Sequence, residues 1–411
     1  MKIKIKEASC AEVLARKTPA HHKPVKPSKA MRLLLRTLSD KELRKVDFSY
    51  ETEGLERLRG KEPCLILMNH SSFVDLPIAQ SIFRDRPIQI VCTLDALVGK
   101  AGLMRSIGCI PTRKFVMDVG LLKDMKYSLE KLRSSVLLFP EAGYSFDGTA
   151  TVLPDSLGKC LKFLNVPVLM VRTYGAFTRD PLYNALQLRK VKVSAKVSYF
   201  LSPEEIRNRS VEELNSAIRE AFSFDNFRWQ QENRLPVTEP FRADHLNRVL
   251  YKCPHCLAEG MMEGKGTRLT CHACGKAYEL TEYGEMKALT GETEISHIPD
   301  WYRWERECVR KELEEGAYAL DIPVSIYMMV DYSALYRVGT GRLIHSTEGF
   351  HLTGCDGALD YVQKPTASYS LNADYYWYEI GDVISIGDRK ALYYCFTEPG
   401  VDVVAKTRLA T

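Results

Sequence analysis

The stretch Cys64-Leu65-Ile66-Leu67-Met68-Asn69-His70-Ser71-Ser72-Phe73-Val74-Asp75 decides the fold of this chain. Its first five residues are apolar and predict a buried strand, and its polar residues follow at the carboxyl end of that strand. Sheets flanked by helices place their ligands at this end of their strands. His70 and Asp75, five positions apart, are therefore a candidate base and the acid that orients it.

A second cluster, Phe139-Pro140-Glu141-Ala142-Gly143-Tyr144-Ser145, follows another short apolar run, 136–138. It repeats the arrangement of the first cluster, with polar residues directly after a predicted strand. These two clusters carry more functional information than the rest of the chain.

Between residues 51 and 240, apolar runs alternate with helical patterns. The runs that predict strands are 64–68, 88–93, 135–139, 166–173 and 191–200. The segments that predict helices are 75–84, 95–106, 118–133, 155–164 and 203–222. This alternation predicts an α/β domain with a mostly parallel sheet flanked by helices, and the polar segment 225–245 predicts its boundary.

The charge of the chain is unevenly distributed. The first 46 residues carry 13 Lys and Arg against 4 Asp and Glu, a net charge of +9. The whole chain has 57 basic and 52 acidic residues, so the remainder has 44 and 48, a net charge of −4. A basic arm on a mildly acidic body indicates contact with a polyanion, either anionic lipid or nucleic acid, unless the arm is only a solvated tail.

Residues 1–50 are expected to form this basic arm and an amphipathic helix. Residues 1–29 have no sustained periodicity and predict a loosely ordered segment. Residues 30–38 predict a short helix with three leucines on one face, Leu33, Leu34 and Leu38. Such a helix can lie in a lipid interface or pack on its own domain, and the pattern leaves both open.

The chain of 411 residues is expected to hold two to three domains. No stretch reaches the roughly 18 apolar residues of a membrane span, and residues 1–6 lack the apolar region of a signal peptide. We therefore expect a cytoplasmic protein, associated with the membrane surface through its basic N-terminus. Its 12 cysteines are then expected to be reduced.

Residues 253–274 contain two Cys-x-x-Cys pairs, Cys253 with Cys256 and Cys271 with Cys274, separated by 14 residues. Each pair points two thiolates at one centre, so two pairs complete a tetrahedral site of four sulfurs. We expect a structural Zn²⁺ in a zinc ribbon over 245–290, without an open position for catalysis. His255 and His272 are expected to be bystanders. The mixed charges of this segment do not form a basic stripe, so nucleic acid is not expected as a partner.

Residues 291–411 are expected to form a helix over 298–316 and then a β-rich domain. From 317 to 405 the chain has runs of Tyr, Val and Ile separated by glycine-containing turns. This composition predicts an antiparallel sheet in a small sandwich or barrel, similar to pleckstrin-like barrels. The aromatic residues are expected to be core rather than a ligand site.

A histidine with a neighbouring aspartate can act as a general base on a hydroxyl, an amine or water. Ser71 and Ser72 are adjacent, so a serine hydrolase has to be considered, but no Gly-x-Ser-x-Gly elbow exists in the chain. Ser72 and Asp75 could instead form a capping box at the next helix. A buried structural role for His70 is the remaining alternative.

The two clusters resemble the signatures of the glycerolipid (lysophospholipid) acyltransferase family, that of bacterial 1-acyl-sn-glycerol-3-phosphate acyltransferases. The first signature, Asn-His-x4-Asp, is matched by Asn69, His70 and Asp75. The third, Phe-Pro-Glu-Gly-Thr-Arg-Ser, is matched by Phe139, Pro140, Glu141 and Ser145. The second and fourth resemble Gly108-Cys-Ile-Pro-Thr112-Arg113 and Val166-Pro167-Val168. The resemblance covers 55–205 and places an acyltransferase domain over 51–240.

The resemblance implies transfer of a fatty acyl group from acyl-CoA or acyl-carrier protein to a hydroxyl of a lysolipid or glycerol-phosphate acceptor. It implies that His70 is the general base, that Asp75 orients it, and that backbone N–H groups near this loop stabilise the oxyanion. The implied substrate-binding residues are Arg113, Lys114, Glu141, Gly143 and Ser145.

The chain departs from the family pattern in the third signature, where Tyr144 replaces the arginine and Ala142-Gly143 replaces Gly-Thr. In the family that arginine supports the phosphate end of the acceptor, and tyrosine cannot replace its bidentate clamp. The resemblance therefore leaves the acceptor head group open. The alternative function is a catalytically inactive acyltransferase-like scaffold that binds lipid or a partner.

Overall fold

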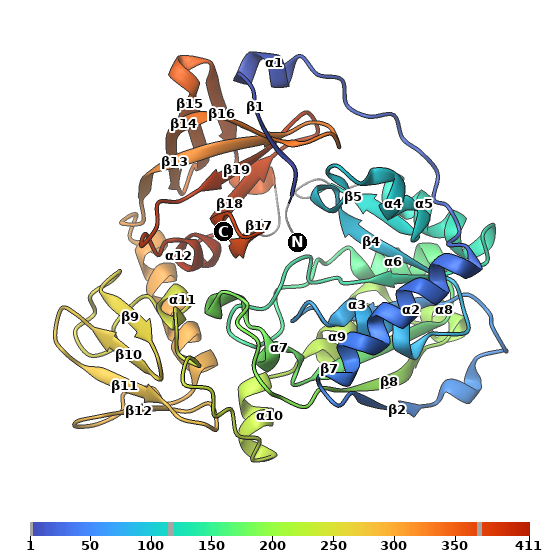
Figure 1. Cartoon of the computed structure of the whole chain (residues 1–411), viewed down its shortest axis with the longest axis horizontal. Helices are drawn as coiled ribbons and strands as arrows, with labels where there is room; N and C mark the ends of the chain where they lie inside the picture. The colour runs from blue at the N-terminus through green and yellow to red at the C-terminus, as the bar shows by residue number, and fades with distance from the viewer. Residues whose placement is uncertain (1–2, 114–118, 368–371) are drawn as a thin grey trace.

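The computed structural model describes residues 3–113, 119–367 and 372–411. The chain forms three sheets (Figure 1). A seven-stranded sheet belongs to the α/β domain, a four-stranded sheet carries the cysteine pairs, and an eight-stranded sheet belongs to the C-terminal region. No helix in the described part of the chain is both long and apolar enough to cross a membrane.

The seven-stranded sheet confirms the predicted mixed α/β architecture. In spatial order its strands are β2 (Ser49–Glu53), β8 (Ser194–Leu201), β7 (Val168–Tyr174), β3 (Leu65–Met68), β6 (Ser135–Leu138), β4 (Ile88–Thr93) and β5 (Cys109–Thr112). All neighbours are parallel except β7 and β8, which are antiparallel. The short edge strands β2 and β5 were not expected from the sequence.

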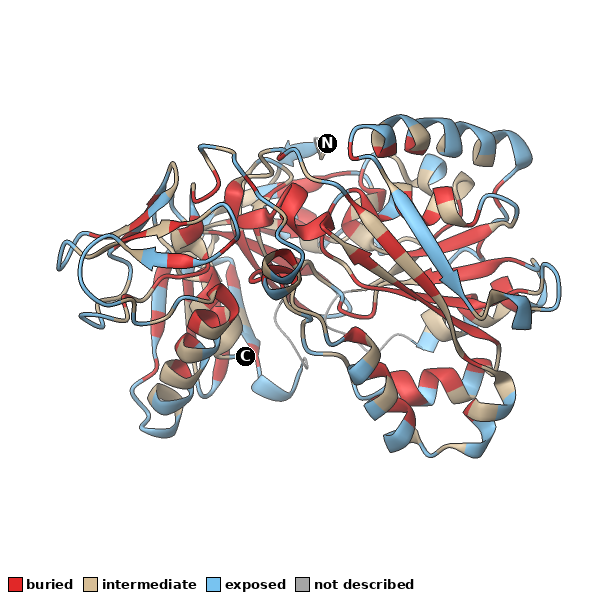
Figure 2. Ribbon diagram, turned by 90° about the horizontal axis from the view of Figure 1, so that it is seen from below, coloured by how far each residue is buried: buried red, intermediate tan, exposed pale blue. Residues whose placement is uncertain are grey.

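Strand β3 shows why this sheet has helices on both faces. Its side chains alternate, so Ile66 and Met68 lie in one apolar cluster and Leu65 and Leu67 in another. The first cluster includes residues of helices α2 (Lys29–Arg44) and α3 (Asp75–Ile82). The second includes residues of α5 (Val119–Glu130), α6 (Leu157–Leu164) and α9 (Val211–Phe222). Figure 2 shows the buried central strands and the exposed edge strand.

Two predicted helices are divided in the structure. The segment 95–106 becomes a 3-10 turn, Leu94–Leu97, and helix α4 (Ala101–Ser106), with Gly99 at φ +72° between them. The segment 203–222 becomes α8 (Pro203–Asn208) and α9, because Ser202 and Ser210 each start a helix with their own capping box. Helix α10 (Asn226–Glu232) lies in the predicted boundary segment.

The N-terminal arm is more ordered than the sequence predicts. Strand β1 (Ile5–Glu7) pairs in parallel with β14 (Leu335–Ser346) of the C-terminal sheet, and helix α1 (Cys10–Leu14) follows it. Ser9 and Glu12 form a capping box at α1, and Cys10 and Val13 are buried in the C-terminal core. The expectation of a loose arm over 1–29 was wrong here, because apolar contacts far along the chain order a segment that lacks periodicity of its own.

The four-stranded antiparallel sheet consists of β9 (Met262–Lys265), β10 (Arg268–Cys271), β11 (Ala277–Leu280) and β12 (Met286–Ala288). Helix α11 (Ile298–Glu314) follows it, as predicted for 298–316. The buried Trp301 of α11 packs edge-on against Tyr278 of β11, so the helix and this sheet share one core.

The C-terminal sheet is antiparallel apart from the β1–β14 pair, as expected from its composition. Its main path is β16 (Leu359–Gln363), β15 (Gly349–Gly354), β14, β13 (Leu320–Met329), β19 (Leu392–Phe396), β18 (Gly381–Gly387) and β17 (Asn372–Trp377). Helix α12 (Val404–Leu409) contacts β17, β18 and α11. In Figure 1 it lies between the C-terminal sheet and the four-stranded sheet.

Candidate functional site

The loop between β3 and α3 brings His70 and Asp75 together. The Nδ1 atom of His70 lies 3.0 Å from Oδ2 of Asp75, and the same oxygen accepts hydrogen bonds from the backbone N–H groups of Ser71 and Ser72, at 2.8 and 3.1 Å. Asp75 is fully buried. A carboxylate held in this way fixes the N–H of the imidazole on Nδ1 and leaves Nε2 as the basic nitrogen.

The imidazole of His70 lies against two aromatic rings of the second cluster. Its centroid is 4.3 Å from that of Phe139 and 3.9 Å from that of Tyr144, and Phe73 stacks on Tyr144 at 5.3 Å. The side chain of His70 retains 19% exposure. Among the described residues, no side chain or backbone group is hydrogen-bonded to Nε2 of His70.

Glu141 joins the second cluster to the first. Its Oε1 accepts the backbone N–H of His70 at 3.1 Å, and its Oε2 accepts that of Thr151 at 2.9 Å. Burial raises the pKa of this carboxyl to about 7, against the opposing effect of the two N–H donors. Both oxygens of Glu141 are thus engaged in positioning the loops around His70.

Ser145 organises its own loop. Its hydroxyl donates to the carbonyl of Thr149 at 2.6 Å and accepts from the backbone N–H of Gly148 at 2.9 Å, while its N–H donates to the carbonyl of His70 at 3.2 Å. Gly143, two residues earlier, has open space where a side chain would be. A group approaching the loop therefore meets no side chain at this position.

Asn69 connects the loop between β3 and α3 to strand β7. Its amide donates to Oγ1 of Thr173 at 3.0 Å and its carbonyl oxygen accepts the backbone N–H of Thr173 at 2.9 Å. Thr173 cannot be predicted from the sequence as part of this site, because a threonine inside a predicted strand carries no signal of its own.

A third buried carboxyl group, that of Asp180, lies next to the loop between β3 and α3. Ser72 donates its hydroxyl to Oδ1 of Asp180, and Asp180 also pairs with Arg179 at 2.7 Å. Burial raises the pKa of Asp180 to about 6. Ser72 also accepts the N–H of Val74 and does not form the capping box considered from the sequence.

A serine nucleophile is not supported by these contacts. Ser72 donates to Asp180, and the hydroxyl of Ser71 lies 3.5 Å from that of Thr173. Within the described residues neither serine is hydrogen-bonded to the ring of His70. The geometry would allow His70 to act as a base on an incoming hydroxyl, amine or water without a serine nucleophile.

Most backbone N–H groups of the loop between β3 and α3 already have acceptors inside the protein. Those of His70, Ser71 and Ser72 donate to the carboxylates of Glu141 and Asp75. Among the described residues of this loop, the N–H of Phe73 has no acceptor. It is therefore the one group here that could act as the expected oxyanion donor. Gly143 and Tyr144, in the facing loop, likewise have no acceptor recorded for their N–H groups among the described residues.

Arg113 lies at the junction with the C-terminal sheet. Its guanidinium donates to the carbonyl of Arg389 in the β18–β19 turn, and it lines a small cavity together with Tyr332 and Lys390. No hydrogen bond or ion pair between Arg113 and the His70 group is recorded in the described part of the chain. Lys114, the other predicted cation, lies outside the described residues.

The C-terminal region contacts three loops at the carboxyl edge of the parallel sheet. Tyr378 donates to Asp95 after β4, at 3.3 Å, and Arg113 after β5 donates to Arg389. In the loop after β6, Phe146 packs on Tyr375 at 4.4 Å. The C-terminal sheet is thus joined to the edge on which the His70 group stands.

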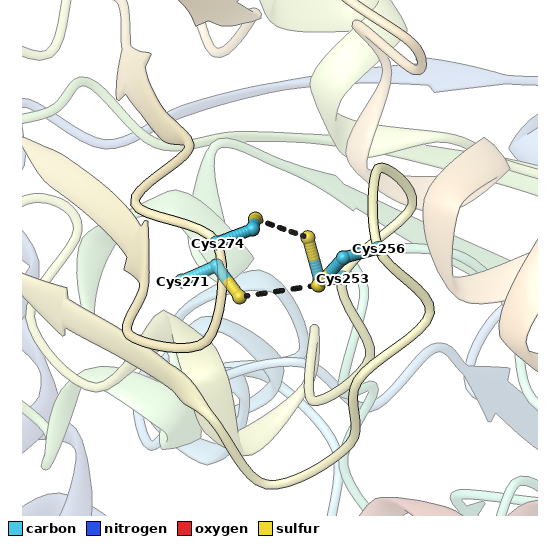
Figure 3. A group of neighbouring side chains, drawn as sticks. All are labelled: Cys253, Cys256, Cys271 and Cys274. Carbon is cyan, nitrogen blue, oxygen red and sulfur yellow. Dashed lines mark hydrogen bonds between the residues drawn. The ribbon is translucent and has the colours of Figure 1, made fainter.

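The four predicted cysteines converge in a second group. The sulfurs of Cys253, Cys256, Cys271 and Cys274 all lie within 4.8 Å of one another (Figure 3). The Cys253–Cys274 and Cys256–Cys271 distances are 3.9 and 3.7 Å. Tetrahedral zinc with sulfur ligands at about 2.3 Å needs sulfurs about 3.8 Å apart, so the donor set fits that metal.

The two histidines of this segment are engaged elsewhere, as predicted. His255 lies 2.9 Å from Glu294, and His272 lies 3.0 Å from Glu263. Neither belongs to the metal-binding group found among the described residues. The group could therefore hold a metal through its four sulfurs alone.

Comparisons with known proteins bear on the α/β domain. Residues 49–173 match the family model of acyltransferases. A solved structure, the 1-acyl-sn-glycerophosphate (LPA) acyltransferase PlsC from Thermotoga maritima, aligns with 46% of this chain and 78% of its own, at 20% identity and a TM-score of 0.35. A likeness of this size carries no argument about mechanism or substrate. No curated protein sequence matches the chain.

Proposed function

We propose that this chain is an O-acyltransferase acting on glycerolipids, on the premise that its residues 49–173 match the family model of acyltransferases. The acyl group would move from acyl-CoA or acyl-carrier protein to a hydroxyl of a lysolipid or glycerol-phosphate-type acceptor. The observation that carries the proposal is the His70–Asp75 pair, with Nδ1 held by a buried carboxylate and Nε2 free.

In the proposed reaction, Nε2 of His70 takes the proton of the acceptor hydroxyl. The oxygen forms a bond to the thioester carbonyl carbon, and the C–S bond then breaks. The thiolate leaves with the proton that His70 has carried, so the imidazole returns to its neutral state. Asp75 compensates the positive charge on the imidazolium, and no acyl-enzyme is formed.

The oxyanion of the tetrahedral intermediate requires N–H donors in the facing loop. We assign this role to Gly143 and Tyr144, since the amides of the catalytic loop are largely occupied. A single donor of this kind lowers the activation barrier by about 3 kcal/mol. Glu141 and Ser145 position the loop, while Arg113 and Lys114 remain the proposed contacts of the acceptor head group.

Membrane association is part of the proposal. Helix α2 packs on α3 through its buried face, but Leu33, Leu34 and Leu38 are 62%, 52% and 54% exposed. Phe73 and Leu76, at the start of α3, are also exposed, next to the catalytic loop. Exposed leucines on a basic helix are typical of an interfacial helix, so we propose that this face contacts lipid and that the protein is a peripheral membrane protein of the cytoplasm.

We also propose that the four cysteines bind one structural Zn²⁺. The sulfurs of Cys253, Cys256, Cys271 and Cys274 would hold the ion, which would stabilise the fold of residues 245–290 and take no part in acyl transfer.

A donor-by-acceptor screen tests the proposed function. Purified protein is incubated with labelled acyl-CoA or acyl-carrier protein and with lysophosphatidate, neutral lysolipids or glycerol phosphate, beside a folded His70→Ala variant. Product that depends on His70 is the expected result. Product at the same rate from His70→Ala would reject the mechanism.

The alternative is a scaffold without turnover, in which the same face binds lipid or a partner. The replacement of the family arginine by Tyr144 keeps this alternative open. It predicts binding of acyl lipid without product in every arm of the screen.

A further inference from the structure

Helix α12 lies between the cysteine segment and the loop that contacts His70. Two of its cations are two positions apart, about 200° around the helix, and so face different neighbours. Lys406 pairs with Glu259 at 2.6 Å and with Glu312 at 2.8 Å, which ties α12 to the cysteine segment and to α11. Arg408 faces the second cluster.

Arg408 makes two contacts there. Its Nη1 donates to the backbone carbonyl of Tyr144 at 3.3 Å. Its guanidinium carbon lies 4.0 Å from the centroid of the Phe146 ring, whose other neighbour is Tyr375 at 4.4 Å. The loop 144–146 is thus held from the C-terminal side by a hydrogen bond and by a cation–π contact.

The same loop holds His70 from the opposite side. The Tyr144 ring lies 3.9 Å from the imidazole, and the N–H of Ser145 donates to the carbonyl of His70. Any displacement of the loop is therefore passed to the imidazole through a ring contact and a backbone hydrogen bond.

We propose that Arg408 is a positioning residue of the acyltransferase site, which acts on His70 through Tyr144. This inference rests on the proposed function. Arg408 contacts the Tyr144 carbonyl and the Phe146 ring, so its effect reaches the reaction through the placement of the loop 144–146, which holds the imidazole and carries the Tyr144 N–H. A misplacement of about 1 Å can lower the rate by as much as 100-fold, and it does so in kcat rather than in KM.

The main test compares Arg408→Ala and Arg408→Lys with Arg310→Ala as the matched control. Arg310 is an exposed arginine of α11 whose ion pairs lie within its own helix. We expect kcat of Arg408→Ala to fall about 10- to 100-fold, with both KM values within about twofold of wild type. The kcat of Arg408→Lys should fall less than that of Arg408→Ala, because lysine keeps the positive charge. It should still fall below wild type, because lysine lacks the planar guanidinium. Arg310→Ala should match wild type.

Two further readouts separate positioning from a merely structural role. Added methylguanidinium should restore part of the kcat of Arg408→Ala, because the site of Arg408 is only half-buried. The rate at which diethyl pyrocarbonate modifies His70, obtained by difference from His70→Ala, should rise in Arg408→Ala as the imidazole loses its ring contact. An unchanged modification rate would overturn the proposal, even if kcat of Arg408→Ala fell.

The modification rate also separates this inference from the proposed function, because it needs no substrate. If the wild-type protein transfers no acyl group, a faster modification of His70 in Arg408→Ala still supports the positioning role. An unchanged rate rejects that role whatever the reaction is. If Arg408→Ala does not fold, Arg408→Lys carries the same comparison.

Discussion

The cysteine group and the His70 group are built in opposite ways. The four cysteines come from residues 253–274, and their sulfurs converge through two short knuckles, one before β9 and one at the end of β10. The groups that order His70 come from Asn69, Glu141, Thr173 and Asp180, and from Arg408 at the far end of the chain. The first site depends on local geometry, and the second depends on the packing of the whole molecule.

This difference predicts how the two sites respond to substitution. A change in the local site should act mainly on its own segment and reach acyl transfer only through the Glu259–Lys406 contact. A change at any anchor of the dispersed site should alter acyl transfer without changing the metal content. The predictions below test that contrast.

The largest expected effect is that of Asp75→Asn. The amide can present its NH₂ group to Nδ1, which would place the imidazole proton on Nε2 and remove the base. We expect kcat to fall about 10³- to 10⁴-fold, with one zinc per chain retained. Steady-state kinetics and metal analysis of the same preparation measure both. Loss of zinc from this variant would contradict the independence of the two sites.

The next effect is that of Cys271→Ser, which removes one of four thiolates. We expect zinc to fall from one per chain towards zero and the segment 245–290 to lose its protection in amide hydrogen exchange. Acyl transfer should fall only about 2- to 30-fold, by way of the contact between Glu259 and Lys406. Protein purified without chelator is the reference, and stoichiometric zinc in the variant would reject a four-sulfur site.

A third effect concerns the pH dependence of stability. Burial raises the pKa of Glu141 to about 7, from 4.5 for an unperturbed glutamate. Between pH 4.5 and 7 the folded protein therefore binds more protons than the unfolded chain, and this group lowers the free energy of unfolding as pH rises through that window. Above pH 7 its contribution is constant.

Glu141→Gln should remove this slope, which amounts to about 3 kcal/mol at most. Denaturant unfolding of both proteins from pH 4.5 to 8 gives the difference curve, in which the similar contribution of Asp180 cancels. Parallel curves would show that folding does not raise the pKa of Glu141. The variant should also be less active, because Gln has one acceptor oxygen for the N–H groups of His70 and Thr151.

The smallest effect is that of Tyr144→Arg on acceptor choice. A guanidinium offers paired N–H donors to a phosphate, so kcat/KM for a phosphate-bearing acceptor should rise about 10-fold relative to a neutral lysolipid. Tyr144→Phe is the control, since it keeps the ring next to His70 and adds no charge. An unchanged ratio would place the head group away from this loop.

The contrast also explains what could be predicted from the sequence. The cysteine spacing predicts all four members of the cysteine group, because they are near neighbours in the chain. The apolar runs predict β3, β4, β6 and β7 closely, because buried strands read as continuous apolar segments. The edge strand β2 is fully exposed and carries no such signal.

At the candidate site, the signatures predict His70, Asp75 and Glu141 as neighbours, and the structure brings them together. Thr173, Asp180 and Arg408 were not predicted. Their roles follow from tertiary packing, and their residue types are ordinary at their positions in the sequence. Local patterns therefore identify the reacting groups but not the residues that hold them in place.

The pairing of β1 with β14 has a consequence for the way this chain is made. Ile5 lies opposite Leu335, so two paired residues of one sheet are 330 positions apart in the sequence. In topological terms the acyltransferase domain is an insertion within the C-terminal β-domain. At a synthesis rate of about 5–20 residues per second, β14 is made on the order of tens of seconds after β1. The acyltransferase fold can thus form before the β-domain closes over its catalytic edge.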